Sequence, residues 1–138
     1  MPEHTFKLEV ITPDRVVMSD SGVVSVVAPG SQGYFGMLAK HAPMMAELKI
    51  GKLDFRRVDD TSNAMAISCG FLEVFEDKVS VLAESAELAD EIDIERAEQS
   101  KRRAEERLEQ NGSEIDVARA EAALARATNR LNIAEGRS

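Results

Sequence analysis

The chain has 138 residues, of which 43% are hydrophobic and 4% aromatic, and its formal net charge at pH 7 is -8. This length suits one ordinary globular core with an appended element. The acidic balance argues against nucleic acid or an anionic lipid surface as a partner, because clustered positive charge binds both. No apolar run approaches the roughly 18 residues that span a bilayer, and the N-terminus lacks the layout of a signal peptide. We therefore expect a soluble, cytosolic protein without direct membrane insertion.

Residues 1–86 have the composition and periodicity of a β-sheet domain. They contain all six aromatic residues and all four prolines, and 20 of the 86 are charged. Phe6, Leu8 and Val10 alternate with polar neighbours, as in a strand with one dry face. Short apolar runs such as "GVVSVVA", "KLDFRRV" and "FLEVF" recur about every ten residues, the spacing of an antiparallel sandwich or barrel. No helical crossover separates them, so we expect an antiparallel β-sandwich.

Residues that carry catalysis are missing from this half. The single cysteine, Cys69, lies in the alternating stretch "AMAISCGFLEV", and we expect it to be a small buried hydrophobic residue. His4 and His41 have no cluster of further ligands beside them, so we expect no metal site. The sequence also contains no Walker loop, dinucleotide fingerprint or nucleophile elbow. We therefore predict no catalytic residues.

Residues 87–138 change to a helical period. They contain no aromatic residue or proline, and 22 of the 52 are charged. "IDIERAEQSKRRAEERL" (92–108) and "IDVARAEAALARATNRL" (115–131) share nine of 17 positions at an offset of 23. Between the copies, Gly112 suits a helix C-cap and Ser113 an N-cap. We predict an antiparallel two-helix hairpin, and therefore an α+β chain with a sandwich over 1–86 and a hairpin over 87–138.

The apolar seam of this hairpin is narrow and rich in alanine. Its positions are Ile94, Ala97, Ala104 and Leu108, with Lys101 as an exception, and then Val117, Ala120, Leu124, Ala127 and Leu131. Small side chains let two helices approach closely. Because little apolar area is buried, we expect the hairpin to be marginal alone and to need another surface.

The arginines of the first arm form a stripe. At about 100° per residue, Arg96, Arg103 and Arg107 lie within about 20° of one line and roughly 120° from the seam. A nucleotide phosphate tail would relieve their repulsion, with Asp93 and Glu87 offering a polar edge for adenine. Alternatively, Asp93 begins the helix and the stripe is solvated or docks a protein. The same pattern recurs in the second arm, and such a repeat can arise from the construction of the hairpin without any binding site.

The ordered set "GYFGMLAKHAPMMAELKIGKL", "SCGFLEVFEDKVSVLAESAE" and "IDIERA" resembles the epsilon subunit of the bacterial F-type ATP synthase over essentially the whole chain. It departs from the family pattern at residues 39–43 and 69–70. The resemblance implies a non-catalytic subunit of the central rotor stalk of a proton- or sodium-translocating synthase, peripheral on the cytoplasmic face of the bacterial plasma membrane. Implied partners are the gamma subunit, the c-subunit ring and, when the hairpin extends and blocks ATP hydrolysis, the alpha and beta subunits of the catalytic head.

The resemblance also implies roles for individual residues. By it, the loop holding Tyr34 and His41 faces the c ring. Positions that match the ATP-binding motif I-D-x-x-R-A of some members are Ile92, Asp93, Arg96 and Ala97, with Glu87 and Arg103 at the remaining matching positions. No cofactor is required, and ATP is the expected regulatory ligand.

Our hypothesis for the inhibitory contact is that exposed arginines bind acidic surfaces of the head. These are Arg103, Arg107, Arg119, Arg126 and Arg130. The sequence leaves open whether the second motif copy, residues 115–120, contacts ligand. It also leaves open two alternative functions, a free-standing ATP sensor and a helical-hairpin interaction module.

Overall fold

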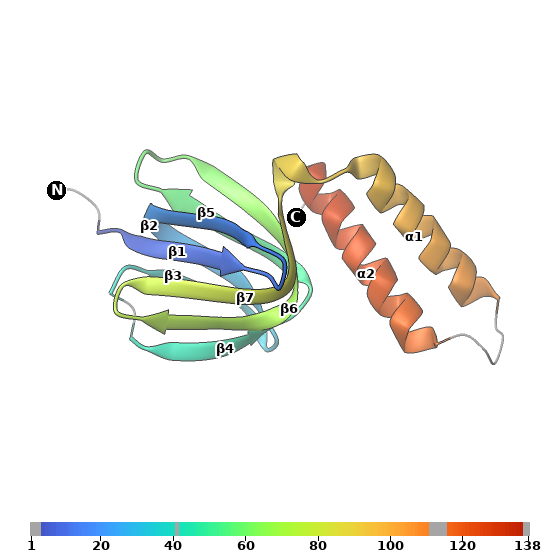
Figure 1. Cartoon of the computed structure of the whole chain (residues 1–138), viewed down its shortest axis with the longest axis horizontal. Helices are drawn as coiled ribbons and strands as arrows, with labels where there is room; N and C mark the ends of the chain where they lie inside the picture. Colours follow the sequence, from blue (N-terminus) through green and yellow to red (C-terminus); the bar gives the residue numbers. More distant parts are fainter. Residues whose placement is uncertain (1–3, 41, 111–115, 137–138) are drawn as a thin grey trace. The chain divides into compact units, whose positions relative to one another are not determined.

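The computed structural model describes residues 4–40, 42–110 and 116–136 (Figure 1). The chain divides into two compact units, Met1–Leu88 and Ala89–Ser138. In its described residues the first unit contains β1 (Phe6–Ile11), β2 (Val16–Gly30), β3 (Gly33–Leu38), β4 (Met44–Leu48), β5 (Gly51–Arg57), β6 (Ser62–Phe75) and β7 (Lys78–Leu88). The second contains a short 3-10 turn, η1 (Ala89–Glu91), and the helices α1 (Ile94–Glu109) and α2 (Val117–Ala134). This is the predicted α+β arrangement. Strand β7 continues two residues past the predicted end of the sandwich segment.

Two long strands hold the sandwich together. β2 has 15 residues and pairs with β1, β3, β4 and β5, whereas β6 has 14 and pairs with β4, β5 and β7. The first half of β6 lies beside β5 and the second half beside β4, so the strand changes its neighbour on one side along its length. The ladders β1–β2, β2–β5, β5–β6, β6–β7 and β7–β1 form a closed ring.

One pairing departs from the prediction. Among the described strands, β1 and β7 run parallel, with Leu8 opposite Val79, while the other ladders are antiparallel. The predicted antiparallel sandwich is therefore present, and this parallel pair is an exception within it. A missing helical crossover excludes parallel pairing only between strands that are close in sequence. β1 and β7 are joined through all the other strands of the sandwich instead.

The core of the sandwich is built from large side chains. Phe6, Leu8 and Val10 alternate inward along β1 as predicted. Leu53 and Phe55 of β5 are at most 2% exposed. Burying a side chain of this size contributes roughly 1.5–3 kcal/mol, so we expect the sandwich to be the more stable of the two units.

Strand β6 changes its inward face at Cys69. Met65 and Ile67 belong to the core before this point, and Leu72 and Val74 belong to it afterwards, so the alternation shifts by one residue. Cys69 has a φ of 33°, which marks a local kink, and its side chain is exposed. The expectation of a buried cysteine was therefore wrong, because simple alternation does not continue through the kink.

Gly70 makes the kink compatible with its neighbour β7. A Cβ atom at this position would collide with the carbonyl oxygen of Leu82 and would lie 2.8 Å from the Cα of Ala83. Only glycine allows the two backbones to approach this closely.

The hairpin has the predicted alanine seam. Ala97, Ala104, Ala120 and Ala127 are at most 2% exposed, and α1 and α2 pack along them. Leu131 and Ile133 add buried area near the end of α2. Ile94 and Val117 were also predicted to lie in the seam, but they are 42% and 53% exposed. Each is the first residue of its helix, before the alanine contacts begin.

The N-cap of α2 is Asp116, so the prediction of Ser113 as its N-cap was wrong. Gly112 and Ser113 lie outside the described residues.

Candidate functional site

The motif I-D-x-x-R-A forms the start of α1. Asp93 is the N-cap, and its carboxylate accepts a hydrogen bond from the backbone N–H of Arg96 at 3.0 Å. Ile92 is 8% exposed and Ala97 is fully buried. The side chain of Arg96 is exposed. Three of the four motif residues therefore build the helix start, and the arginine is the one presented to solvent.

The second motif copy has the same local structure. Asp116 has φ -81° and ψ 98°, against -80° and 101° for Asp93. Its carboxylate accepts a hydrogen bond from the N–H of Arg119 at 3.0 Å, and Ala120 is buried. Residue 115 lies outside the described residues. The internal repeat thus gives the hairpin two equivalent helix starts, one in each arm.

The two long sides of the hairpin have different chemistry. Both helices line a shallow groove on one side with Glu98, Lys101, Arg102, Glu105, Thr128, Leu131, Asn132 and Glu135. Each residue of a helix is rotated about 100° from the one before it. Arg96, Arg103 and Arg107 are therefore rotated about 100° around the axis of α1 from the buried alanines, on the side away from this groove. The same holds on α2, because the repeat preserves the spacing. We define the arginine face as Arg96, Arg103, Arg107, Arg119, Arg126 and Arg130.

The arginine face concentrates positive charge. Six of the seven arginines of α1 and α2 belong to it, and Arg102 lies in the groove opposite. Arg103 and Arg107 are one turn apart and repel each other. Arg103 donates a hydrogen bond to the Ser100 hydroxyl at 3.2 Å. Asp93 and Asp116, the acids at the ends of this face, cap backbone N–H groups. The face is therefore suited to a polyanion.

Glu87 differs in position from the other predicted nucleotide-binding residues. It lies on β7 opposite Ala66, within the sandwich, and is half-buried. Ile92, Asp93, Arg96, Ala97 and Arg103 belong to the hairpin unit.

Tyr34 lies at the start of strand β3 and not in a loop. Its hydroxyl accepts a hydrogen bond from the backbone N–H of Lys52 at 3.1 Å, and the Lys49 ammonium is 5.9 Å from the ring centre. Gly51 leaves room for this contact, because a Cβ there would lie 2.8 Å from the hydroxyl. Residues 33–38, which precede His41, form β3, so the expectation of one loop holding both residues was wrong. His41 lies outside the described residues.

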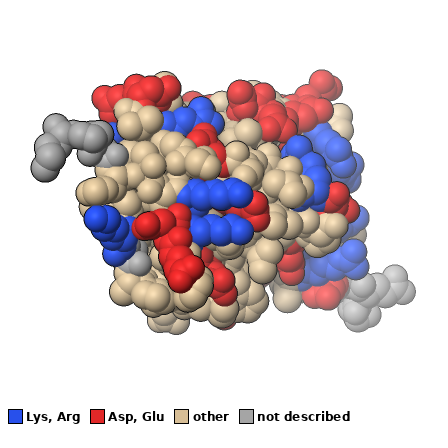
Figure 2. Space-filling model, turned by 60° about the vertical axis from the view of Figure 1, so that its left-hand side comes forward, with Lys and Arg blue, Asp and Glu red and all other residues tan. Residues whose placement is uncertain are grey.

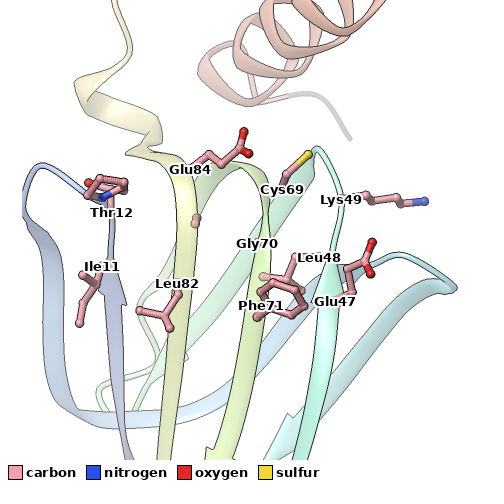
Figure 3. Close-up of a pocket in the computed structure, with 12 residues that line it drawn as sticks. Ile11, Thr12, Glu47, Leu48, Lys49, Cys69, Gly70, Phe71, Leu82 and Glu84 are labelled. Atoms are coloured by element: carbon pink, nitrogen blue, oxygen red, sulfur yellow. The ribbon is translucent and has the colours of Figure 1, made fainter. Parts of the chain in front are cut away.

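Sequence reasoning missed an apolar groove on the sandwich. Its lining residues are Ile11, Thr12, Pro13, Glu47, Leu48, Lys49, Cys69, Gly70, Phe71, Leu82, Ala83 and Glu84. Figure 3 shows Ile11, Leu82 and Phe71 side by side on β1, β7 and β6. Phe71 and Leu82 are 53% and 56% exposed. The outward direction of Phe71 follows from the kink at Cys69, which the apolar pattern alone did not reveal.

Charge elsewhere on the sandwich is mixed. Glu9 lies 3.8 Å from the Lys7 ammonium and 3.6 Å from that of Lys78, and Figure 2 shows basic and acidic side chains interleaved on the face it presents. Among the described residues, no group of three or more His, Cys, Asp or Glu side chains is placed to hold a metal ion. In the same residues, neither helix has the length and apolar character needed to cross a membrane.

Two protein-family models match the chain in succession. The model of the ATP synthase delta/epsilon chain β-sandwich domain covers residues 5–89, and the model of the long α-helix domain of the same chain covers residues 90–135.

Curated relatives and solved structures agree with these matches. An ATP synthase epsilon chain from Syntrophomonas wolfei is 47% identical over 109 residues, which is 79% of each chain. One from Moorella thermoacetica is 48% identical over 104 residues, covering 75% of this chain and 77% of the relative. A chain of the Euglena gracilis mitochondrial ATP synthase superposes with a TM-score of 0.78 at 21% identity, covering 91% of this chain and 78% of the other, which supports the fold.

Proposed function

This chain belongs to the ATP synthase delta/epsilon chain family, and from that membership we propose that it is a non-catalytic subunit of the central rotor stalk of an F-type ATP synthase. The two successive domain matches over almost the whole chain support this assignment. In the proposal, the sandwich attaches the subunit to the rotor and the hairpin regulates ATP hydrolysis. The complex translocates protons or sodium ions, and the subunit is peripheral on the cytoplasmic face of the plasma membrane.

The proposed partners of the sandwich are the gamma subunit and the c ring. The apolar groove with exposed Phe71 and Leu82 supports a protein partner, because exposed apolar side chains gathered on one face mark interaction surfaces. We assign the groove to gamma. Tyr34, held at one end of β3 by Lys52 and 56% exposed, is the proposed contact with the c ring.

The proposed ligand of the hairpin is ATP. The observation that carries this proposal is the arginine face, in which Arg96 and Arg103 lie two turns apart on the same side of α1. Each guanidinium can bind phosphate oxygens with two parallel N–H donors. Ile92 and Ala97 would act through the shape of the helix start, since both are buried.

The hairpin then works as a ligand-controlled switch. A compact arrangement that brings Glu87 to the hairpin arginines binds ATP, whereas an extended arrangement offers the arginine face to acidic surfaces of the alpha and beta subunits. ATP shifts the balance by its differential affinity for the compact form. The inhibitory contacts are Arg103, Arg107, Arg119, Arg126 and Arg130.

A calorimetric titration of the whole chain with ATP tests the ligand. We expect saturable binding, weaker binding of GTP, and a loss of about tenfold or more in Arg103→Ala. Arg102→Ala is the matched control, because Arg102 neighbours Arg103 in sequence but lies in the opposite groove. Absence of binding at millimolar ATP, or equal losses in both variants, would reject the nucleotide site and leave the stalk assignment intact.

Co-purification tests the stalk assignment. Co-expression with the gamma subunit should give a stable complex, and Phe71→Ser with Leu82→Ser should weaken it because both side chains line the groove. A chain that never co-purifies with gamma contradicts the assignment.

Charge reversal of the five docking arginines tests the proposed contact with the head. It should relieve inhibition of ATP hydrolysis, and unchanged inhibition would contradict the proposed contact.

A further inference from the structure

The arginine face is longer than one nucleotide site. Arg96 and Arg107 are eleven residues apart, which is about 16 Å along α1 at 1.5 Å per residue. Arg119 and Arg130 span the same number of residues on α2. A triphosphate tail bound near the start of α1 is shorter than this row, so it leaves Arg107 and Arg119 without phosphate contacts. These two residues are the far pair.

Through the internal repeat, Arg107 and Arg119 of the far pair correspond to Arg130 near the end of α2 and to Arg96 near the start of α1. α1 and α2 run antiparallel (Figure 1), and their buried alanines face each other. Arg119 follows the N-cap Asp116 as Arg96 follows Asp93, with the same 3.0 Å capping hydrogen bond. The two ends of the arginine face therefore present similar chemistry, joined by Arg103 and Arg126 in the middle.

The space between the two rows suits an extended chain. The positions there are Ser100 and Ala123, both small and half-buried. Helices that pack through small residues have axes about 8–10 Å apart, so guanidinium groups from both rows can reach a ligand lying between them. The basic residues of the opposite side, Lys101 and Arg102, lie beside Glu98 and Glu105 in the groove. The groove therefore mixes basic and acidic side chains, whereas the arginine face gathers six arginines on the other side.

We infer that the arginine face binds linear inorganic polyphosphate along its whole length as one continuous site, of which the proposed nucleotide site is one half. Every unit of such a chain carries negative charge and phosphate oxygens that match the arginine fork. Binding one chain across both halves makes the second half's contacts intramolecular, which raises affinity over a ligand that fills one half. This inference shares Arg96 and Arg103 with the proposed function but needs no nucleotide.

The test is calorimetry of the whole chain with two phosphate probes, tripolyphosphate and long-chain polyphosphate. We expect the long chain to bind more tightly. Substitution of the far pair, Arg107→Gln with Arg119→Gln, should weaken long-chain binding about tenfold, and tripolyphosphate binding by less than about twofold. The matched control is Lys101→Gln with Arg102→Gln, which removes the same charge from the opposite side and should stay within about twofold of the original chain. Circular dichroism verifies that both variants keep their helices.

Three other outcomes overturn the inference. Equal weakening in the far-pair variant and the control means general charge attraction, and no weakening in the far-pair variant means that this end takes no part. Equal binding of polyglutamate with the same arginine dependence means an acidic-peptide surface. If ATP fails to bind while long-chain polyphosphate binds through the far pair, the nucleotide proposal fails and this inference stands.

Discussion

The sandwich and the hairpin are each stabilised internally by a different amount of buried apolar surface. The sandwich buries Phe55, Leu53, Met65 and other large side chains almost completely. The hairpin seam is centred on four buried alanines, and its larger buried residues, Leu131 and Ile133, lie near the end of α2. Because stabilisation scales with buried apolar area, we expect the sandwich to be the more stable unit and the hairpin the less stable one. In the proposed switch, a marginally stable hairpin would let a ligand of modest affinity change its conformation.

Separating the two units should show the largest difference between them. We expect a fragment of residues 1–88 to unfold cooperatively in denaturant, because its closed ring of strands and its core are complete. A fragment of residues 89–138 should show little helix at 25 °C, since two helices of 16 and 18 residues on an alanine seam are marginal in water. Circular dichroism during urea titration measures both. Cooperative unfolding of the isolated hairpin would contradict the comparison.

Gly70→Ala should produce the largest effect of a single substitution in the sandwich. The added Cβ meets the backbone of β7 at Leu82 and Ala83, which can move only if the ladder opens. We expect a loss of about 3 kcal/mol or more in the free energy of unfolding. Gly36→Ala is the control, because a Cβ there lies 3.7 Å from its nearest neighbours, in ordinary contact. Equal stability of the two variants in denaturant titration would mean that the close approach is not a constraint.

The helix caps should have smaller and equal effects. Asp93→Ala and Asp116→Ala each remove an acceptor for a backbone N–H, at a cost of about 1 kcal/mol of helix stability. Amide hydrogen exchange of the first turn of each helix measures this loss. Asp93→Asn and Asp116→Asn keep the acceptor oxygen and should retain most of the protection. Unequal losses at the two caps would show that the copies of the repeat are not equivalent.

Periodicity was sufficient to predict the architecture because the two units obey simple rules. Two patterns indicate a buried face directly. One is the alternation of Phe6, Leu8 and Val10 in a strand, and the other is the 3,4 spacing of the buried alanines in the helices. The parallel pairing of β1 with β7 and the kink at Cys69 were not predictable in this way. The first depends on the path of the whole chain. The kink depends on the backbone conformation at Cys69. The neighbouring Gly70 is compatible with that conformation, but a glycine alone does not predict it.

The candidate site could be predicted only in part from the sequence, for a similar reason. The arginine stripe on α1 followed from spacing, and the repeat placed a second stripe on α2. That both stripes face the same side of the hairpin required the structure, in which the groove lined by Glu98, Arg102 and Thr128 identifies the other side. The apolar groove at Phe71 was hidden until the kink at Cys69 showed which way that side chain points.

The turn between β5 and β6 should give the smallest effect, and it lies on the stable unit. The Thr61 hydroxyl and backbone N–H both donate to the Asp59 carboxylate, at 2.6 and 3.0 Å, and these bonds lower the pKa of Asp59 from its ordinary value. A lowered folded-state pKa adds stability above the unfolded pKa, and that stability is lost as pH falls through the folded value. Asp59→Asn should therefore be slightly less stable than the original chain at pH 7, and the difference should shrink in acid. Denaturant titrations of both proteins on either side of the ordinary aspartate pKa measure it, and a difference that is the same at both pH values would show that the turn gains nothing from the charge.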